Sequence, residues 1–335
     1  MKRYARITGW GKSLPQRVVT NDDLAQIVDT SDEWIVSHTG IRERRIVEQG
    51  QETTSSMSVE ACRQALERAG VTPEEVDLII IATSTPDYFC PPVSSMVQDK
   101  LGATHAAAFT LTSGCTGFVY GLVTGSQFIE TGLYNKVLVV GVETLSASLD
   151  WTDRRTCVLF GDGAGAVVVG PTEAGHGVLG SALIGQGEWG HLLVIPAGGS
   201  KQPVDEEALR THADKIVMEG HDVFRLSVRG VPVVCEQALD RAGVTADDIE
   251  WVIMHQANKR IMDAAAKRFG WDADHIPITI DKYGNTSAAS MPITLDDVYR
   301  QGRMKPGDHV LFIGFGAGFA LGAAVVEWTK EPPSA

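Results

Sequence analysis

The sequence lacks the residue patterns that hold disulfides or metal ions. Its nine histidines are scattered, and no two of them form an H-x-x-x-H or H-x-E pair. The cysteines are widely spaced and form no C-x-x-C pair; they are Cys62, Cys90, Cys115, Cys157 and Cys235. A disulfide framework needs an even set of cysteines, and a zinc site needs closely spaced ligands. We therefore expect neither in this protein.

Long apolar runs and an excess of positive charge are also missing. No apolar stretch approaches the ~20 residues of a membrane-spanning helix, and the basic N-terminus is not followed by the apolar core of a signal peptide. The chain has 29 basic and 42 acidic residues, a formal net charge of −13 that opposes general binding to nucleic acid. We expect a cytoplasmic protein that binds neither membranes nor nucleic acid.

What the sequence does contain is an internal repeat. Residues 65–82 (ALERAGVTPEEVDLIIIA) and 238–255 (ALDRAGVTADDIEWVIMH) are identical at eight of 18 positions and lie 173 residues apart. Each copy predicts an amphipathic helix ended by a glycine, a short acidic turn after a threonine, and an apolar strand. At the same spacing, residues 137–141 match 310–314. We therefore predict an α/β protein of two pseudo-twofold-related halves, 1–175 and 176–335, each a mixed sheet flanked by helices.

The two halves differ at positions that carry reactive groups. The first copy of the repeat ends in Ala82 and the second in His255. Residues 112–115 (TSGC) correspond to residues 286–289 (TSAA), so that one half has a cysteine where the other has inert small residues. This asymmetry is typical of a site that has been added to a duplicated scaffold.

Cys115 is the candidate nucleophile. A β-rich run before it gives way to small residues and then to a helical pattern that continues to residue 129. The cysteine therefore lies near a helix N-terminus, where the helix dipole lowers the pKa of a thiol and favours the thiolate. A free cysteine is also commonly a buried core residue. The local sequence alone does not choose between these two interpretations.

Three further segments could complete a site around this cysteine. His255 stands where an apolar strand meets a polar turn, and Asn285 lies in a turn that opens another helix. Residues 315–319 (FGAGF) form a strand-to-turn segment whose backbone N–H groups could stabilise an oxyanion. Each of the three also has an ordinary structural interpretation. The glycine-rich run 161–165 precedes a strand, so it is not a Rossmann phosphate-binding turn, which opens a helix.

Several motifs together carry a family resemblance. The most specific are HQAN at 255–258, GNTSAAS at 284–290 and CTGF at 115–118, and they are joined by FGDGAGA at 160–166 and GFGAG at 314–318. With them the chain resembles, nearly end to end, β-ketoacyl-acyl-carrier-protein synthase III, a condensing enzyme of the thiolase superfamily. The resemblance implies a thiolase-like fold layered α-β-α-β-α and a homodimer. It implies no cofactor, because CoA and carrier-protein thioesters are the substrates.

The resemblance also implies a role for each reactive group. Cys115 would take an acyl group from acyl-CoA as a thioester, with the backbone N–H groups of Cys115 and Ala317 as the oxyanion hole. His255 and Asn285 would then donate hydrogen bonds to the carbonyl of a malonyl thioester. These bonds stabilise the enolate that is left when CO2 departs and that attacks the acyl-cysteine. Two residues would border the sulfur: Phe315 and Gly316. The product would be a 3-oxoacyl carrier protein, the first intermediate of fatty-acid synthesis.

Binding residues follow from the same resemblance. Trp34 and Arg154 match residues that hold the CoA nucleotide, while Phe224 and Asn258 match residues that line the pantetheine tunnel. A basic cluster stands out on a chain of charge −13 and is our candidate docking site for the acidic malonyl carrier protein. The cluster consists of Lys259, Arg260, Lys267 and Arg268, with Arg225 and Arg229 as a second contribution.

Two positions depart from the family pattern. His38 stands where members usually have arginine, and the loss of a permanent cation near the CoA nucleotide would weaken CoA binding or indicate a different acyl donor. Cys90 falls where many members place a phenylalanine that closes the acyl pocket across the dimer interface. Because cysteine is smaller, we expect a roomier pocket that accepts primers longer or bulkier than acetyl.

Other functions within the superfamily need separate consideration. A thiolase needs a second catalytic cysteine late in the chain, and none follows Cys235. Chalcone-synthase-like enzymes lack the GNTS context, and hydroxymethylglutaryl-CoA-synthase-like enzymes need an acidic base that the sequence does not locate. Two alternatives stay open: a starter enzyme or acyltransferase of polyketide or quinolone secondary metabolism, and a catalytically inactive binding homologue.

Overall fold

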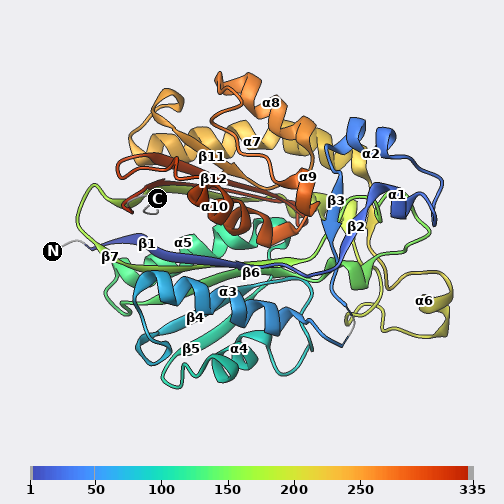
Figure 1. Ribbon diagram of the computed structural model, residues 1–335, viewed down its shortest axis with the longest axis horizontal. Helices are drawn as coiled ribbons and strands as arrows, with labels where there is room; N and C mark the ends of the chain where they lie inside the picture. Colours follow the sequence, from blue (N-terminus) through green and yellow to red (C-terminus); the bar gives the residue numbers. More distant parts are fainter. Residues whose placement is uncertain (1–2, 49, 331–335) are drawn as a thin grey trace.

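Two mixed sheets form the centre of the protein (Figure 1). The structure is a computed structural model that describes residues 3–48 and 50–330. One sheet has the order β1-β7-β6-β4-β5 and consists of β1 (Tyr4–Ser13), β4 (Leu78–Ala82), β5 (Ala107–Leu111), β6 (Val137–Glu143) and β7 (Gly163–Thr172). The other has the order β11-β12-β13-β8 and consists of β8 (Gly177–Gly185), β11 (Trp251–Met254), β12 (His309–Gly316) and β13 (Ala320–Glu327).

Four strands of the first sheet share the topology of the second sheet, as the sequence repeat predicts, while β5 is an additional strand. In the first sheet β4 pairs with β6 in parallel, and β6–β7 and β7–β1 are antiparallel. In the second, β11 pairs with β12 in parallel, and β12–β13 and β13–β8 are antiparallel. The prediction of two similar α/β halves is therefore confirmed. The chain changes sheets between β7 and β8; the division into domains at residue 175 stays a proposal.

Helices separate the sheets and cover their outer faces. Between the sheets lie α5 (Gly117–Glu130) and α10 (Ser290–Arg300), whose Phe118 and Met291 share one core cluster with Ile80 and Phe312 of the two sheets. The outer layers are α3 (Thr54–Ala69) and α4 (Val93–Leu101) on one side, and α7 (Gly220–Ala242) and α8 (Lys259–Phe269) on the other. The result is the five-layer arrangement visible in Figure 1. None of the described helices is both long enough and apolar enough to cross a bilayer.

The repeated segments fold in the predicted way. Helices α3 and α7 end at Gly70 and Gly243, whose φ angles of 64° and 73° lie in the left-handed region that glycine adopts without strain. Thr72 and Thr245 then form capping boxes with the acidic residue three positions later. The strands β4 and β11 that follow are buried at every position because helices cover both faces of their sheets.

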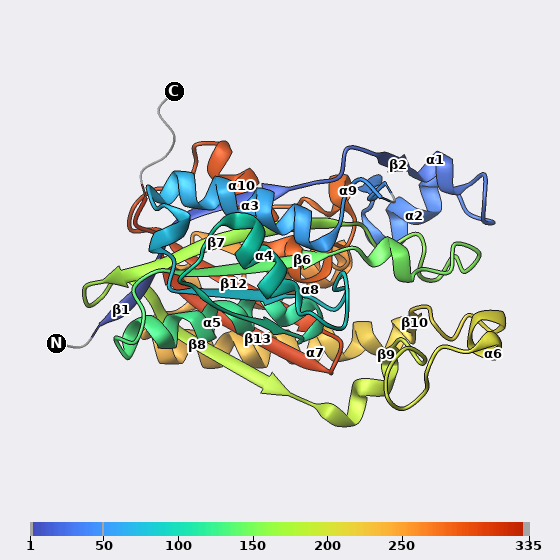
Figure 2. The same cartoon turned by 90° about the horizontal axis from the view of Figure 1, so that it is seen from below.

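Smaller elements gather at one end of the molecule (right side of Figures 1 and 2). They include β2 (Val18–Thr20) paired with β3 (Glu43–Arg45), β9 (Leu193–Val194) paired with β10 (Val217–Met218), α1 (Asn21–Leu24), α2 (Asp32–Thr39) and α6 (Glu206–Arg210). Helix α9 (Ile280–Tyr283) contacts β3. The short 3-10 helices are η1 (Pro73–Glu75), η2 (Gly114–Thr116), η3 (Leu145–Ser148), η4 (Gly187–Leu192), η5 (Ala246–Asp248) and η6 (Ser287–Ala289).

The glycine-rich run 161–165 serves packing between segments. It leads into strand β7, as expected, and not into a helix. A Cβ on Gly161 would lie 2.2 Å from the carbonyl oxygen of Tyr283, so only glycine allows the two segments to approach. The N–H of Gly161 donates to the carbonyl of Asn285 at 3.0 Å, and the N–H of Asn285 donates to Leu159 at 2.9 Å. The run therefore fixes the backbone that carries Asn285.

We predict that Gly161→Ala lowers the free energy of unfolding by about 1–3 kcal/mol, the usual cost of forcing extra atoms into a packed contact. Urea unfolding followed by circular dichroism measures this change. Gly185→Ala is the matched control, because an added Cβ there meets no heavy atom within 4 Å. Equal midpoints for the two variants would show that the contact with Tyr283 does not constrain residue 161.

Candidate active site

The structure brings most of the predicted reactive residues to one narrow cavity of about 80 Å³. The cavity lies between the two halves, because its walls come from η2, β12 and the ends of α7 and β11. The sequence-predicted residues that line it are Cys115, Phe224, His255, Asn258, Asn285, Phe315 and Gly316. Residues up to 201 positions apart in the sequence therefore share one small space.

Cys115 sits in η2, immediately before the first turn of α5, as the sequence predicts. Burial raises the pKa of its thiol to about 11, although the hydroxyl of Ser287 and the backbone N–H groups of Ala317 and Cys115 favour the anion. The expectation that the helix dipole would give a low thiol pKa is thus wrong for the free chain. Burial of the thiolate raises the pKa by more than the helix N-terminus lowers it.

The strand end beside the sulfur leaves no spare volume. A Cβ on Gly316 would lie 2.7 Å from the Cβ of Cys115 and 2.9 Å from its Sγ, so a glycine is required there. Ala317 follows in the turn between β12 and β13, and its N–H faces the sulfur. The two N–H groups proposed for the oxyanion hole are therefore adjacent to Cys115.

His255 follows the last residue of β11 and is buried. Its N–H donates to the carbonyl of Ile313 at 2.7 Å, and its ring meets that of Phe315 edge to face at 5.1 Å. Burial lowers the pKa of the imidazole to about 3. The ring is therefore neutral at physiological pH, which makes it a hydrogen-bonding group and not a cation.

The hydroxyl of Ser290 decides which ring nitrogen of His255 carries the hydrogen. Ser290 Oγ lies 2.8 Å from His255 Nδ1 and 2.8 Å from the carbonyl oxygen of Ser287. When the hydroxyl donates to Nδ1, the hydrogen of the neutral ring sits on Nε2, which becomes a donor. When it donates to Ser287, Nδ1 carries the hydrogen and Nε2 is an acceptor. The role proposed for His255 requires the first state.

Asn285 has a fixed amide orientation. Its Oδ1 accepts the backbone N–H of Ser287 at 2.9 Å. Because a backbone N–H only donates, the oxygen must face Ser287 and Nδ2 is left as a donor on the cavity side. This orientation is the one that a donor to a substrate carbonyl needs.

The residues expected to bind the CoA nucleotide also lie together. Trp34 stacks on His38 with ring centroids 4.5 Å apart, and the Arg154 guanidinium lies 5.3 Å from the Trp34 ring centroid. Asn258 Nδ2 donates to the carbonyl of His38 at 3.0 Å. Because Asn258 lines the cavity, it connects the Trp34 cluster to Cys115.

Cys90 is exposed and does not line this cavity of its own chain. The preceding residue, Phe89, has 88% of its surface exposed. The family resemblance implies that residue 90 closes the acyl pocket of the other subunit of a dimer. The role of Cys90 in that pocket therefore stays a prediction.

The basic cluster on α8 is exposed but partly neutralised. Three of its members pair with carboxylates: Lys259 with Asp263, Arg268 with Glu236, and Arg225 with Asp222. Arg260 and Lys267 make no ion pair with any described residue. The Arg260 guanidinium lies 5.5 Å from the ring centroid of Phe224, a residue of the cavity wall, which places this cation near the cavity.

The sequence of this chain is similar to one family of known proteins over most of its length. The 3-oxoacyl-[acyl-carrier-protein] synthase III family matches residues 109–187, and its C-terminal region matches residues 239–328. The chain is 50% identical over 329 residues to a β-ketoacyl-[acyl-carrier-protein] synthase III of Caldanaerobacter subterraneus subsp. tengcongensis, covering 98% of this chain and 99% of that protein. The chain belongs to the β-ketoacyl-[acyl-carrier-protein] synthase III family.

Solved structures agree with this assignment. The crystal structure of 3-oxoacyl-[acyl-carrier-protein] synthase III from Aquifex aeolicus VF5 has a TM-score of 0.89 and 41% identity, covering 97% of this chain and 100% of that one. The priming β-ketosynthase of the R1128 polyketide pathway has a TM-score of 0.92 and 35% identity, covering 99% and 98%. The thiolase-like fold of this synthase is confirmed, and its family consists of acyl-transferring condensing enzymes.

Sequence reasoning missed two polar residues at the sulfur of this synthase. Ser287, expected to be inert, has its Oγ 3.3 Å from Cys115 Sγ and 3.3 Å from Glu143 Oε1. Glu143 is the last residue of β6 and is fully buried. Two signals for Glu143 were available in the sequence. The repeat spacing of 173 residues pairs Glu143 with Gly316, and Glu143 is an acidic residue at the end of an apolar strand.

We predict that Ser290→Ala slows decarboxylation of a malonyl thioester by up to about 10²-fold, the effect of losing one oxyanion donor. Without the hydroxyl, nothing holds the hydrogen of His255 on Nε2. Self-acylation of Cys115 does not use this donor and should change little. Release of CO2 from the malonyl thioester and the acyl mass gained by the enzyme measure the two steps.

The matched control is Ser126→Ala, which removes another buried hydroxyl that bonds only within α5, to Leu122 at 2.8 Å. It should leave both half-reactions near their normal rates. An equal loss in both steps for Ser290→Ala would contradict the role given to this hydroxyl.

Proposed function

We propose that this synthase transfers an acyl group from acyl-CoA to Cys115 and condenses it with a malonyl group on acyl carrier protein, giving a 3-oxoacyl carrier protein and CO2. The observation that carries the proposal is the cavity in which a buried cysteine faces a free amide donor from Asn285 and a neutral imidazole. CoA and carrier-protein thioesters are the substrates, and the reaction needs no cofactor. We place the enzyme in the cytoplasm, at the start of fatty-acid synthesis.

In the first half-reaction the sulfur of Cys115 attacks the thioester carbonyl of acyl-CoA. The carbonyl oxygen gains negative charge, which the N–H groups of Cys115 and Ala317 stabilise. Collapse of the tetrahedral intermediate breaks the bond to the CoA sulfur and leaves a new thioester on Cys115. The departing CoA thiolate takes up one proton, so that free CoA is the first product.

In the second half-reaction two neutral donors act on the malonyl thioester. Asn285 Nδ2 and His255 Nε2 donate to its carbonyl oxygen, where negative charge develops as the carboxylate leaves as CO2. The resulting enolate carbon attacks the acyl-Cys115 carbonyl and expels the thiolate. Neutral donors suit this step because they stabilise the enolate without protonating it.

The Trp34 cluster is the proposed site for the CoA nucleotide. The adenine would stack on Trp34, with Arg154 beside it, and pantetheine would pass Asn258 and Phe224 towards Cys115. In the free protein His38 and Arg154 both contact the Trp34 ring. The adenine would therefore compete with these side chains for the ring.

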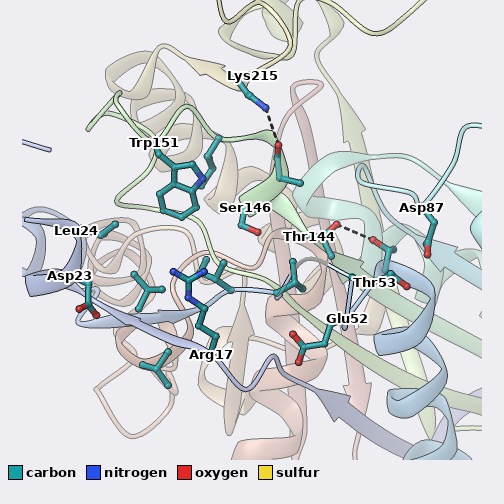
Figure 3. Close-up of a pocket in the computed structure, with 18 of the residues that line it drawn as sticks. Arg17, Asp23, Leu24, Glu52, Thr53, Asp87, Thr144, Ser146, Trp151 and Lys215 are labelled. Atoms are coloured by element: carbon teal, nitrogen blue, oxygen red, sulfur yellow. Dashed lines mark hydrogen bonds between the residues drawn. The ribbon is translucent and has the colours of Figure 1, made fainter. Parts of the chain in front are cut away.

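A homodimer is supported by two exposed features. Strand β5 is the end strand of its sheet, with an edge that no other described strand covers. Phe89 and its neighbour Tyr88 are mostly exposed, and Tyr88 lines an open cavity of about 1190 Å³. Figure 3 shows Asp87 and Trp151 on opposite sides of that cavity. Unpaired strand edges and exposed aromatic side chains are features that a second subunit covers. Light scattering of the purified protein tests this assignment.

We predict that acyl-CoA adds one acyl mass to the protein and that Cys115→Ala abolishes the gain. Cys157→Ala is the matched control, because Cys157 is a buried thiol outside the cavity and its loss should leave acylation intact. Asn285→Ala should still acylate, while malonyl decarboxylation falls by about 10²–10³-fold. Intact-protein mass spectrometry and CO2 release give the two readouts.

The same assay reports the size of the acyl pocket and the pathway. With cysteine at position 90, isobutyryl-CoA and octanoyl-CoA should acylate the enzyme as well as acetyl-CoA does; a strict acetyl preference would overturn this. The likeness to the R1128 priming β-ketosynthase favours, as a second candidate, a starter enzyme of secondary metabolism. That candidate gains support only if the acylated enzyme rejects the malonyl carrier protein of fatty-acid synthesis.

We predict that Arg260→Glu and Lys267→Glu raise the KM for malonyl carrier protein about tenfold at low salt, because these two exposed cations of α8 pair with no described carboxylate. The KM for malonyl-CoA should stay the same, and added salt should reduce the difference. Arg63→Glu, on the exposed face of α3 over the other sheet, is the control. Equal KM changes with both extenders would argue against docking at α8.

A further inference from the structure

A single hydroxyl connects the nucleophile to a buried carboxylate. Ser287 Oγ lies 3.3 Å from Cys115 Sγ on one side and 3.3 Å from Glu143 Oε1 on the other. The hydroxyl has one hydrogen, so it can donate to the sulfur or to the carboxylate, but not to both. A thiolate at Cys115 and a carboxylate at Glu143 therefore compete for the same donor.

Ser287 is held in place by its backbone. Its φ angle of 50° lies in the left-handed region, which a serine adopts at a cost of about 1–2 kcal/mol. The N–H of Ser287 donates to Asn285 Oδ1, and its carbonyl oxygen lies 2.8 Å from Ser290 Oγ. Two residues of the active site thus fix a strained conformation that directs Oγ between Cys115 and Glu143.

Glu143 is placed to change its charge. Its Oε2 accepts from Thr85 Oγ1 at 2.6 Å, and the N–H of Ser84 is shared between Oε1 at 3.2 Å and Oε2 at 3.1 Å. Oε1 is also the oxygen that faces Ser287. Burial nevertheless raises the pKa of Glu143 to about 7. This carboxyl group can therefore take up or release a proton near neutral pH, unlike an ordinary surface glutamate.

The two groups cannot both be ionised at low cost. Both are buried, and the negative charge of Glu143 raises the pKa of Cys115 further. Two such interacting groups titrate as a pair with two pKa values. At a pH between these two values the pair holds a single proton. The thiolate of Cys115 is then accessible at neutral pH when the proton moves to Glu143, without a net change of charge in the interior.

Besides Cys115, His255 is the only ionisable side chain among the described residues that line the cavity, and Glu143 lies outside that lining. The imidazole of His255, with a pKa of about 3, is a weak base for a thiol. The hydrogen-bond partners of Glu143 are hydroxyls and a backbone N–H, which bring no charge of their own. Glu143 is thus the described group that is best placed to accept a proton from the sulfur.

We propose that Glu143 accepts the proton of Cys115 through the hydroxyl of Ser287 when the sulfur attacks an acyl thioester. The inference rests on the proposed role of Cys115 as the nucleophile. The S–H bond breaks as a new O–H bond forms at Ser287, and the former Ser287 hydrogen passes to Glu143 Oε1. A thiolate and a neutral carboxylic acid result. After acyl transfer the CoA thiolate takes up one proton and Glu143 releases one, so that the balance closes.

The test is the pH dependence of Cys115 alkylation by iodoacetamide, followed by peptide mass spectrometry from pH 5.5 to 9.5. In the wild-type enzyme the rate should rise tenfold per pH unit up to about pH 7 and then level off, because the pair has lost its first proton. In Glu143→Gln the rise should continue, since the thiol must then lose its proton to solvent. At pH 9 this variant should react up to about 10²-fold faster than wild type, tenfold for each pH unit above 7.

Ser287→Ala keeps the contacts of Glu143 with Thr85 and Ser84 and tests the bridge separately. The alkylation rate of this variant should still level off, but at a higher pH. The first anion that the Cys115–Glu143 pair forms then lacks the hydroxyl donor of Ser287. The control is Asp162→Asn, which removes another buried carboxylate, one that bonds Ser146 and Val47 and should leave the profile unchanged.

Two outcomes would overturn the proposal: a wild-type rate that rises steadily to pH 9.5, or a plateau that Glu143→Gln does not alter. The second outcome would make Glu143 a purely structural acceptor for residues 83–85. Because iodoacetamide needs neither CoA nor carrier protein, this result is independent of the acyl-CoA experiment. A failure of acylation with an intact alkylation profile would count against the proposed function and not against the proton transfer.

Discussion

The two halves approach each other through glycines that leave no room for a side chain. A Cβ on Gly141 would lie 2.2 Å from the carbonyl oxygen of Ala288, and one on Gly314 would lie 3.0 Å from the Cα of Thr116. These glycines close the matched segments 137–141 and 310–314, so each half presses one strand against the turn of the other. This reciprocal contact brings the two halves together beside the cavity. Cys115 reaches the polar groups of the second half by the same route.

Much of this arrangement could be predicted from the sequence, because its signals are local or repeated. The helix ends at Gly70 and Gly243 and the buried strands after them each follow from a few neighbouring residues. Cys115, His255 and Asn285 could be found from motifs. The partners of Cys115 could not, because the contact of Ser287 with Glu143 spans 144 positions and depends on how the halves pack. The raised pKa of the Cys115 thiol could not be predicted for the same reason. The start of a helix can be recognised from neighbouring residues, whereas burial of the thiol depends on the packing of distant segments.

The electrostatics of the cavity favour neutral groups throughout. Burial keeps the imidazole of His255 uncharged and the thiol of Cys115 protonated in the free chain. Negative charge therefore appears mainly as a reaction proceeds, where fixed donors such as the amide of Asn285 stabilise it. Donors already in position need no rearrangement at that moment. In the proposed mechanism, the duplicated scaffold thus separates the covalent carrier in one half from the enolate-stabilising donors in the other.

The ring of Trp34 is not an empty platform, since His38 stacks on it and the Arg154 guanidinium lies close by. If adenine stacks on Trp34 as we propose, it exchanges one stacking contact for another, and the net free energy of that exchange is a difference between two similar terms. The proposed CoA nucleotide would then be recognised but released quickly. In the proposed reaction, quick release of CoA clears the cavity for the malonyl substrate.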